Sequence, residues 1–217
     1  MPIHGKGILI TSMNIDEAHE DEFNLWYDRE HLAERVAIDG FIEARRWVAT
    51  QADPKYFATY TTTAFENLIS PAYQQALANQ TAWSRKNIDR FKDMIRVVGR
   101  ITHSVGVGRG AVLGVVRIRP EQDKRDSLRS ALAAQLDPAN IESLISMHLI
   151  ESDPIYSKSL TEPDKPNPGA SDWFILVEGT DSNAVQRLTD DRFGSKALPV
   201  ITVGYYKLLW DLAKADL

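Results

Sequence analysis

The sequence contains no cysteine, no long hydrophobic run and no block of basic residues. The absence of cysteine excludes disulfide bonds, thiolate nucleophiles and cysteine-ligated metal sites. No segment approaches the ~20 apolar residues that a membrane-spanning helix needs, so we expect no membrane partner. The net charge is -5 and no positive segment is concentrated, which argues against nucleic acid as a partner because it is bound by clustered Lys and Arg.

The start of the chain leads from Met1 into an apolar segment without the charged, apolar and small-residue regions of a secretory signal. A cytoplasmic protein is therefore the simplest expectation. Of the 217 residues, 43% are hydrophobic and 25% are charged. These proportions are typical of a folded protein, and the length suits one large domain or two small ones.

Alternation and helical periodicity indicate one order of elements, β-α-β-β-α-β, in each half of the chain. In the first half these elements are expected at 6–13, 16–37, 41–50, 56–63, 64–92 and 94–107, and the helical stretch 64–92 is expected to be interrupted near Ser70-Pro71. In the second half they are expected at 110–119, 121–136, 141–151, 172–179, 182–191 and 202–211, with a long loop at 152–171. A glycine-rich segment, Gly106–Gly110, separates the halves and predicts domains at residues 1–107 and 108–217.

This order of elements is that of the ferredoxin-like motif, in which helices cover one face of a four-stranded antiparallel sheet. The other face of such a sheet is open. Two units in one chain can bury those open faces against each other. We therefore predict an α+β fold in which two tandem ferredoxin-like (βαββαβ) repeats form a barrel within the chain, with room for a small ligand in its middle.

Residues 22–32 are the most informative segment, because they place a histidine, two aromatic residues, an amide and several charges on one helix. At ~100° per residue the polar side chains form one stripe, with Tyr27 beside it. This stripe consists of Asn24, Asp28, His31 and Arg35. The adjacent apolar stripe, which is expected to seat the helix on the sheet, consists of Leu25, Leu32 and Val36.

The strand that follows the helix carries two consecutive arginines. Alternation places Arg45 and Trp47 on one face, whereas Arg46 shares the other face with small aliphatic side chains that suit helix packing. Arg45 and Trp47 are then expected to point into the barrel, where arginine binds a carboxylate or enolate oxygen and tryptophan covers an aromatic ring. The alternative for Arg45 is a buried ion pair with Glu43 or another acid.

The segments Trp26–His31 (Trp-Tyr-x-x-x-His) and Gly40–Trp47 (Gly-Phe, then basic and aromatic residues) resemble EthD-like proteins of the dimeric α/β-barrel superfamily. Residues 70–73 and 81–85 resemble the second helix of bacterial tandem members. The resemblance covers roughly residues 5–107, because the second half matches only in the order of its elements. It implies an intrachain dimeric α/β-barrel with a cleft between sheet and helices, and cofactor-free chemistry on small, often aromatic molecules. The difference between the halves indicates one functional pocket per chain.

The candidate catalytic residues are His31, Tyr27 and Arg45. Imidazole titrates near neutral pH, so His31 is expected to act as general acid and base. Tyr27 and Arg45 are expected to stabilise negative charge. The candidate substrate-binding residues are Asn24, Trp26, Asp28, Trp47 and His103. Asp28 is also placed to orient the imidazole.

Two alternatives for the histidines stay open. His31 could be a structural residue whose charge favours the C-terminal part of its helix. His31, His103 and His148 could converge on a metal with Asp28 or Glu30, but the sequence has no H-x-H or H-x-x-x-H spacing. We expect no metal and no cofactor.

The leading hypothesis is a cofactor-independent lyase or isomerase acting on an aromatic, phenolic or oxo-acid metabolite. A cofactor-free monooxygenase is the nearest alternative, since this fold hosts several reactions. A second class of function is a non-catalytic or stress-associated barrel that binds a small ligand. A third is an assembly module whose exposed strand edges join chains, and a homodimer is possible in each case.

Overall fold

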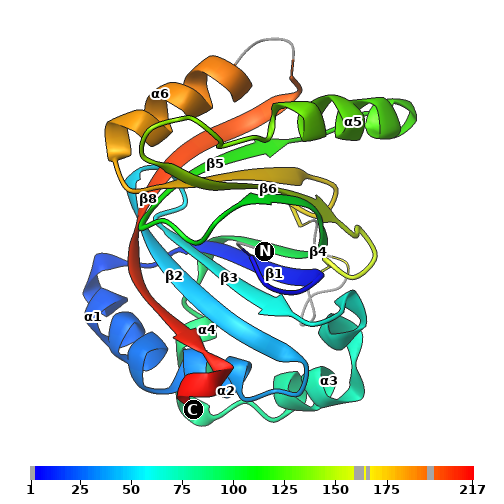
Figure 1. Ribbon diagram of the computed structural model, residues 1–217. Helices are drawn as coiled ribbons and strands as arrows, with labels where there is room; N and C mark the ends of the chain where they lie inside the picture. Colours follow the sequence, from blue (N-terminus) through cyan, green and yellow to red (C-terminus); the bar gives the residue numbers. More distant parts are fainter. Residues whose placement is uncertain (1–2, 159–163, 165–166, 195–197) are drawn as a thin grey trace.

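Eight antiparallel strands form a closed barrel in the computed structural model, which describes residues 3–158, 164, 167–194 and 198–217 (Figure 1). The order around the barrel is β1-β3-β2-β8-β5-β7-β6-β4. The strands are β1 (Gly7–Asn14), β2 (Phe41–Gln51), β3 (Tyr56–Thr62), β4 (Lys92–Gly106), β5 (Val112–Ile118), β6 (Leu144–Ser152), β7 (Trp173–Gly179) and β8 (Val200–Ala213).

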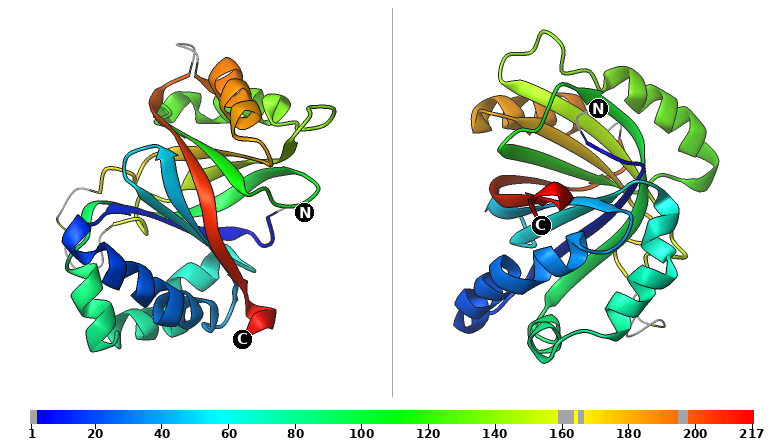
Figure 2. Two further views of the ribbon diagram at one scale, coloured as in Figure 1. Left: turned by 90° about the vertical axis from the view of Figure 1, so that its left-hand side faces the viewer. Right: turned by 60° about the horizontal axis from the view of Figure 1, so that its bottom comes forward.

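The helices cover two opposite sides of the barrel, with those of the first half on one side and those of the second half on the other (Figures 1 and 2). The first side has α1 (Glu17–Trp26), a π-helix (Tyr27–His31), α2 (Leu32–Val36), a 3-10 helix (Phe65–Ile69), α3 (Pro71–Ala78) and α4 (Ala82–Ile88). The second side has a 3-10 turn (Gln122–Lys124), α5 (Arg125–Gln135) and α6 (Ser182–Phe193). A 3-10 turn (Lys214–Asp216) follows β8.

The predicted α+β class and the order of elements are confirmed. The predicted helical stretch at 64–92 is divided into three helices. The interruption predicted near Ser70-Pro71 is confirmed, and a second one at Thr81 was not predicted. The Ser70 hydroxyl caps α3 by accepting from the Tyr73 N–H, and the Thr81 hydroxyl caps α4 by accepting from the Ser84 N–H. Part of the predicted loop at 152–171 lies outside the described residues.

Both halves contribute to one continuous barrel wall. Strand β8 pairs with β2, and β4 pairs with β6, so each half is joined to the other along two seams. The division at residues 107 and 108 stays a prediction. Each of the eight strands has a neighbour on both sides, and this contradicts the assembly hypothesis, which requires exposed strand edges in the described barrel.

The middle of the barrel is packed with side chains, which corrects the expectation of a ligand there. Its core includes Ile8, Ile10, Trp47, Phe57, Val97, Leu113, Ile150 and Phe174. A cavity beside Arg45, Trp47 and Glu178 has only about 10 Å³ of free space. That is the room of about one water molecule. Two further cores lie between the barrel wall and the helices on its two sides.

Within the part of the chain that the structure describes, none of the helices combines the length and the apolar character needed to cross a membrane.

Candidate functional site

The helix that carries the Trp-Tyr-x-x-x-His segment contains a π-turn. The Leu32 N–H donates to the carbonyl of Tyr27, five residues earlier, so the π-helix Tyr27–His31 inserts one extra residue into the helix. Such insertions are rare and occur frequently at functional sites. The predicted continuous helix is thus present from Glu17 to Val36, with its phase shifted at the residues that carry the motif.

The sheet-facing side of this helix is aromatic before the π-turn. Phe23, Trp26 and Tyr27 are buried, whereas the side chain of Leu25 is 51% exposed. The prediction that Leu25 seats the helix is therefore wrong. The larger aromatic side chains take the buried face, since they remove more apolar area from water. Leu32, beyond the π-turn, is buried as predicted.

His31 lies among three aromatic rings. Its imidazole is tilted by 31° over Trp26, with ring centroids 4.2 Å apart. Tyr27 and Tyr60 meet it edge-on at centroid distances of 5.0 and 6.2 Å. The helix supplies Trp26 and Tyr27, and β3 supplies Tyr60. The imidazole is thus surrounded by aromatic side chains from both the helix and the sheet.

Hydrogen bonds of its indole N–H hold Trp26 in place. Its indole N–H donates to the Glu30 carboxylate at 3.2 Å and to the Ser84 hydroxyl at 3.1 Å. Glu30 also accepts from Thr81 Oγ1 at 2.6 Å. The prediction that Trp26 binds substrate stays untested, but the fully buried ring forms a fixed wall for His31.

Arg46 is the arginine that enters the layer between helix and sheet. Its guanidinium lies 4.2 Å from the centroid of the Tyr27 ring, close enough for a cation–π interaction. It donates to Asn24 Oδ1 and, at 3.2 Å, to Asp28 Oδ1. Asp28 also accepts from the indole N–H of Trp210, which comes from β8 in the second half, at 2.8 Å. Asn24 and Asp28 therefore position Arg46. The prediction that Asp28 orients the imidazole is not confirmed, because no hydrogen bond between described residues joins Asp28 to His31.

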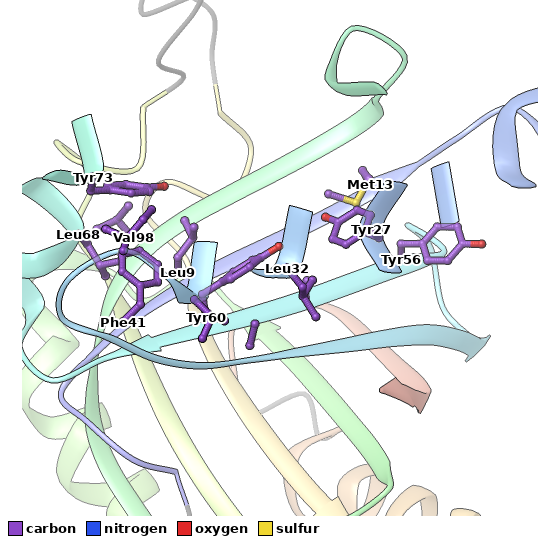
Figure 3. Packing of buried hydrophobic residues seen from close by; sticks show 14 of the residues in the cluster. Leu9, Met13, Tyr27, Leu32, Phe41, Tyr56, Tyr60, Leu68, Tyr73 and Val98 are labelled. Atoms are coloured by element: carbon purple, nitrogen blue, oxygen red, sulfur yellow. The ribbon is translucent and has the colours of Figure 1, made fainter. Parts of the chain in front are cut away.

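Several buried polar atoms in this layer have no hydrogen-bond partner among the described residues. They are His31 Nδ1, Arg35 Nε and Nη1, Arg46 Nε, the Tyr60 hydroxyl and Thr11 Oγ1. Figure 3 shows the hydroxyls of Tyr27 and Tyr60 directed toward one another from the helix and from β3. Buried polar groups in native proteins are nearly always partnered, so a group of unpartnered ones marks a place for water or a ligand.

The electrostatics of the layer favour a neutral imidazole. Burial and the positive charges of Arg35 and Arg46 lower the pKa of His31 well below its ordinary value of 6.5. Burial raises the pKa of Tyr27, and it raises the pKa of Tyr60 well above 10. At neutral pH the layer therefore holds two guanidinium cations, a neutral base and two protonated phenols.

Arg45 and Trp47 point into the barrel, as the alternation predicted, and this separates them from His31. Arg45 donates to Glu178 Oε2 and to the carbonyl of Gly110, both at 2.6 Å, and its guanidinium lies 4.4 Å from the Trp47 ring. The expected alternative of an ion pair with another acid is thus present, with Glu178 as the acid. Of the candidate site residues, Arg45 and Trp47 are therefore separated from Tyr27 and His31, because the barrel wall lies between the two pairs.

The remaining histidines lie elsewhere. His103 is only partly buried on β4, next to a β-bulge between Ile101 and His103 that breaks the alternation used to predict its direction. His148 is buried inside the barrel, where Nδ1 lies 2.9 Å from Ser104 Oγ and Nε2 lies 3.6 Å from Glu178 Oε1. In the described ranges, no three His, Asp or Glu side chains form a group that could hold a metal ion, contrary to the three-histidine alternative.

The layer on the opposite side of the barrel has a different character. Its core is mainly aliphatic, and includes Val116, Ile118, Leu132, Leu149, Ile175, Val177 and Val185. The buried polar atoms without a hydrogen-bond partner among the described residues differ between the halves: Arg35, Arg46, His31 and Tyr60 contribute them in the first half, whereas Arg125 Nε and Ser152 Oγ are those of the second half. The two layers therefore differ in character, and one functional pocket per chain stays a prediction.

Sequence reasoning missed Arg46, Tyr60 and Thr11 as members of the site. One signal was present for Arg46: it is the cation on an otherwise small and aliphatic strand face, with Ala44 and Val48 as neighbours. A charged side chain on such a face needs a specific partner. Tyr60 and Thr11 offered no signal, because tyrosine and threonine are common strand residues.

Comparisons with known proteins identify the architecture. No protein-family model and no curated protein matches the sequence. Solved structures match nearly its whole length. An anthrone oxidase-like protein has a TM-score of 0.68 at 8% identity, over 99% of this chain and 96% of the other. The chain has a dimeric α/β-barrel fold.

Two further structures have the same barrel. A provisionally named monooxygenase from Fusobacterium nucleatum has a TM-score of 0.60 at 9% identity, over 98% of this chain and 96% of the other. Another provisionally named monooxygenase, from Lactobacillus acidophilus, has a TM-score of 0.57 at 7% identity, over 97% of each chain. At these identities the likeness shows the dimeric α/β-barrel fold. The narrower resemblance to EthD-like proteins stays a prediction.

Proposed function

We propose that the protein is an enzyme that removes a proton from a small phenolic or oxo-acid molecule bound against His31. The observation that carries this proposal is the neutral, unpartnered imidazole among three aromatic rings, beside two buried guanidinium groups. A general base needs a free lone pair, and an enolate or phenolate product needs nearby positive charge. Both requirements are met by residues of the first half.

In the first step, His31 takes a proton from a C–H or O–H group of the substrate and becomes an imidazolium. The electron pair of the broken bond stays on the substrate as an enolate or phenolate. Arg46 and the hydroxyl of Tyr60 stabilise the oxyanion. Tyr60 is suited to donate a hydrogen bond because burial keeps its phenol protonated.

The second step returns the proton. Arg35 and Arg46 disfavour a third positive charge beside them, so the imidazolium is a strong acid that readily protonates the bound anion. Protonation at a different carbon gives an isomerase. Protonation after loss of carbon dioxide or of a leaving group gives a lyase.

Oxygenation is the second candidate, and the monooxygenase and anthrone oxidase-like names of the matched structures favour it. The carbanion formed at His31 would transfer electrons to molecular oxygen, which is then a co-substrate. For a methylene group the balanced outcome is CH₂ + O₂ → C=O + H₂O. The proton removal at His31 is common to both candidates.

The test measures the proton transfer at His31, which both candidate functions require. Candidate phenols and oxo acids are incubated with enzyme in D₂O, and exchange of the acidic C–H is followed by NMR while an electrode records oxygen. Wild-type protein is expected to catalyse exchange, and His31→Gln to lose it at least 10²-fold with an unchanged circular dichroism spectrum. Oxygen uptake separates the oxygenase from the lyase or isomerase. Exchange or product formation at the wild-type rate in His31→Gln would sink the proposal, as would saturable binding without any product.

A further inference from the structure

Arg35 is a buried cation without a matched anion. Its side chain is 4% exposed, and neither Nε nor Nη1 has a hydrogen-bond partner in the described part of the chain. Within 4.0 Å of the guanidinium, the described residues supply one carboxylate, that of Glu34, at 3.9 Å from Nη2. That distance exceeds the 2.7–3.2 Å usual for an N–H···O hydrogen bond.

Glu34 is also poorly suited to neutralise Arg35. It is the preceding residue on the helix, and its side chain is 33% exposed. It accepts a hydrogen bond from Ser84 Oγ at 3.4 Å. Burial and the neighbouring charge of Glu30 raise the pKa of Glu34.

The other buried cation of the layer, Arg46, has hydrogen-bond partners of its own. Arg46 is matched by Asp28 and by the amide of Asn24. His31, Tyr27 and Tyr60 are neutral at neutral pH. An arginine stays protonated when buried, and a buried unpaired charge is unfavourable. Arg35 is therefore a buried cation of this layer that has no hydrogen-bonded anion among the described residues.

We propose that Arg35 binds a carboxylate group of the substrate, so that the molecule bound against His31 is a flat, unsaturated organic acid. This rests on the proposed function, because that function defines which part of the molecule reacts. A carboxylate supplies the hydrogen-bonding anion that Arg35 lacks, and its two oxygens match the planar guanidinium. Trp26, Tyr27 and Tyr60 accommodate the unsaturated part.

The spacing of His31 and Arg35 along the helix indicates which part of the substrate reacts. Arg35 follows His31 by four residues, and side chains at that spacing lie on one helix face with about 5–6 Å between their Cβ atoms. A carboxylate held at Arg35 thus brings the carbon atoms next to it toward the imidazole. The acid is expected to lose its proton from a carbon or hydroxyl close to the carboxylate.

Benzoate is the first probe, with benzamide and benzyl alcohol as neutral analogues of similar shape. Binding to the full-length protein is measured by calorimetry at pH 7.5, with Arg35→Met, Arg35→Lys and the exposed-site control Arg29→Met. We expect benzoate to bind at least tenfold more tightly than benzamide. Affinity is expected to fall at least tenfold in both Arg35 variants and to stay unchanged in Arg29→Met. Equal affinity of benzoate for wild type and Arg35→Met would overturn the proposal.

Thermal unfolding without ligand gives a second readout. Removal of an unpaired buried cation is expected to leave the melting temperature of Arg35→Met unchanged or raised, whereas loss of a structural ion pair would lower it and contradict the proposal. Inorganic phosphate or chloride that binds as tightly as benzoate would overturn the assignment to an organic acid. If carboxylate binding depends on Arg35 but turnover is unchanged in His31→Gln, the proposed function is wrong and the carboxylate site at Arg35 still stands.

Discussion

Arg45 and Arg46 are consecutive on β2, and their guanidinium groups lie on opposite faces of the barrel wall. Arg45 is paired with Glu178 inside the barrel, whereas Arg46 stacks on Tyr27 beneath the helix. One residue type at adjacent positions is therefore expected to give two kinds of mutational effect. The first is on the stability of the barrel, and the second is on the chemistry at His31.

Replacing Arg45 by methionine is expected to destabilise the protein by about 3–5 kcal/mol, because Glu178 is left charged and buried without its partner. Urea unfolding measures the change. The double variant Arg45→Met/Glu178→Gln is expected to recover part of the loss. A fall in turnover without any loss of stability would contradict this structural role and would support the prediction that Arg45 is catalytic.

Replacing Arg46 by lysine is expected to lower kcat/KM by roughly 10²-fold. Lysine retains the charge but cannot bridge Asn24 and Asp28 while it stacks on Tyr27, so the oxyanion loses a fixed donor. Steady-state kinetics on a substrate found in the exchange screen measure the change. Kinetics like those of the wild type would contradict the placement of Arg46 at the site.

The lowered pKa of His31 makes stability depend on pH in one direction. Below pH 6.5 the unfolded chain binds a proton at this residue and the folded chain does not, so acidification favours unfolding. His31 is expected to contribute its stability fully above pH 6.5 and to lose up to about 1.4 kcal/mol per pH unit below it. Unfolding free energies from pH 8 to 5 should show a shallower acid slope in His31→Gln than in His19→Gln. Equal slopes would exclude a depressed pKa.

Tyr60 and Tyr56 both lie on β3, but their hydroxyl groups differ in hydrogen bonding. The Tyr60 hydroxyl has no partner among the described residues, whereas that of Tyr56 donates to Glu20 and accepts from Asn24 at 3.1 Å. Tyr60→Phe is thus expected to change stability by less than about 1 kcal/mol but to reduce turnover, and Tyr56→Phe to lower stability by about 1–3 kcal/mol. The opposite ranking in urea unfolding would show that the Tyr60 hydroxyl is satisfied in the folded protein.

The elements of the fold could be predicted because they depend on local patterns. Strand patterns identified β2 and β3, and the amphipathic periodicity of residues 16–37 identified the helix. The π-turn could not be predicted, since a period of 3.6 residues assumes a regular helix. The partners of Arg45 and Arg46 could not be predicted either, because Glu178 is 133 residues from Arg45 and the barrel closes only in three dimensions.

The two helix-covered layers can change in sequence independently, because different segments of one polypeptide encode them. Two identical subunits must use one sequence for both layers, so a destabilising group of buried cations and phenols would be present twice. In this chain the aliphatic second layer supplies stability without that burden. Selection on chemistry and selection on folding can therefore act on different halves of the same molecule.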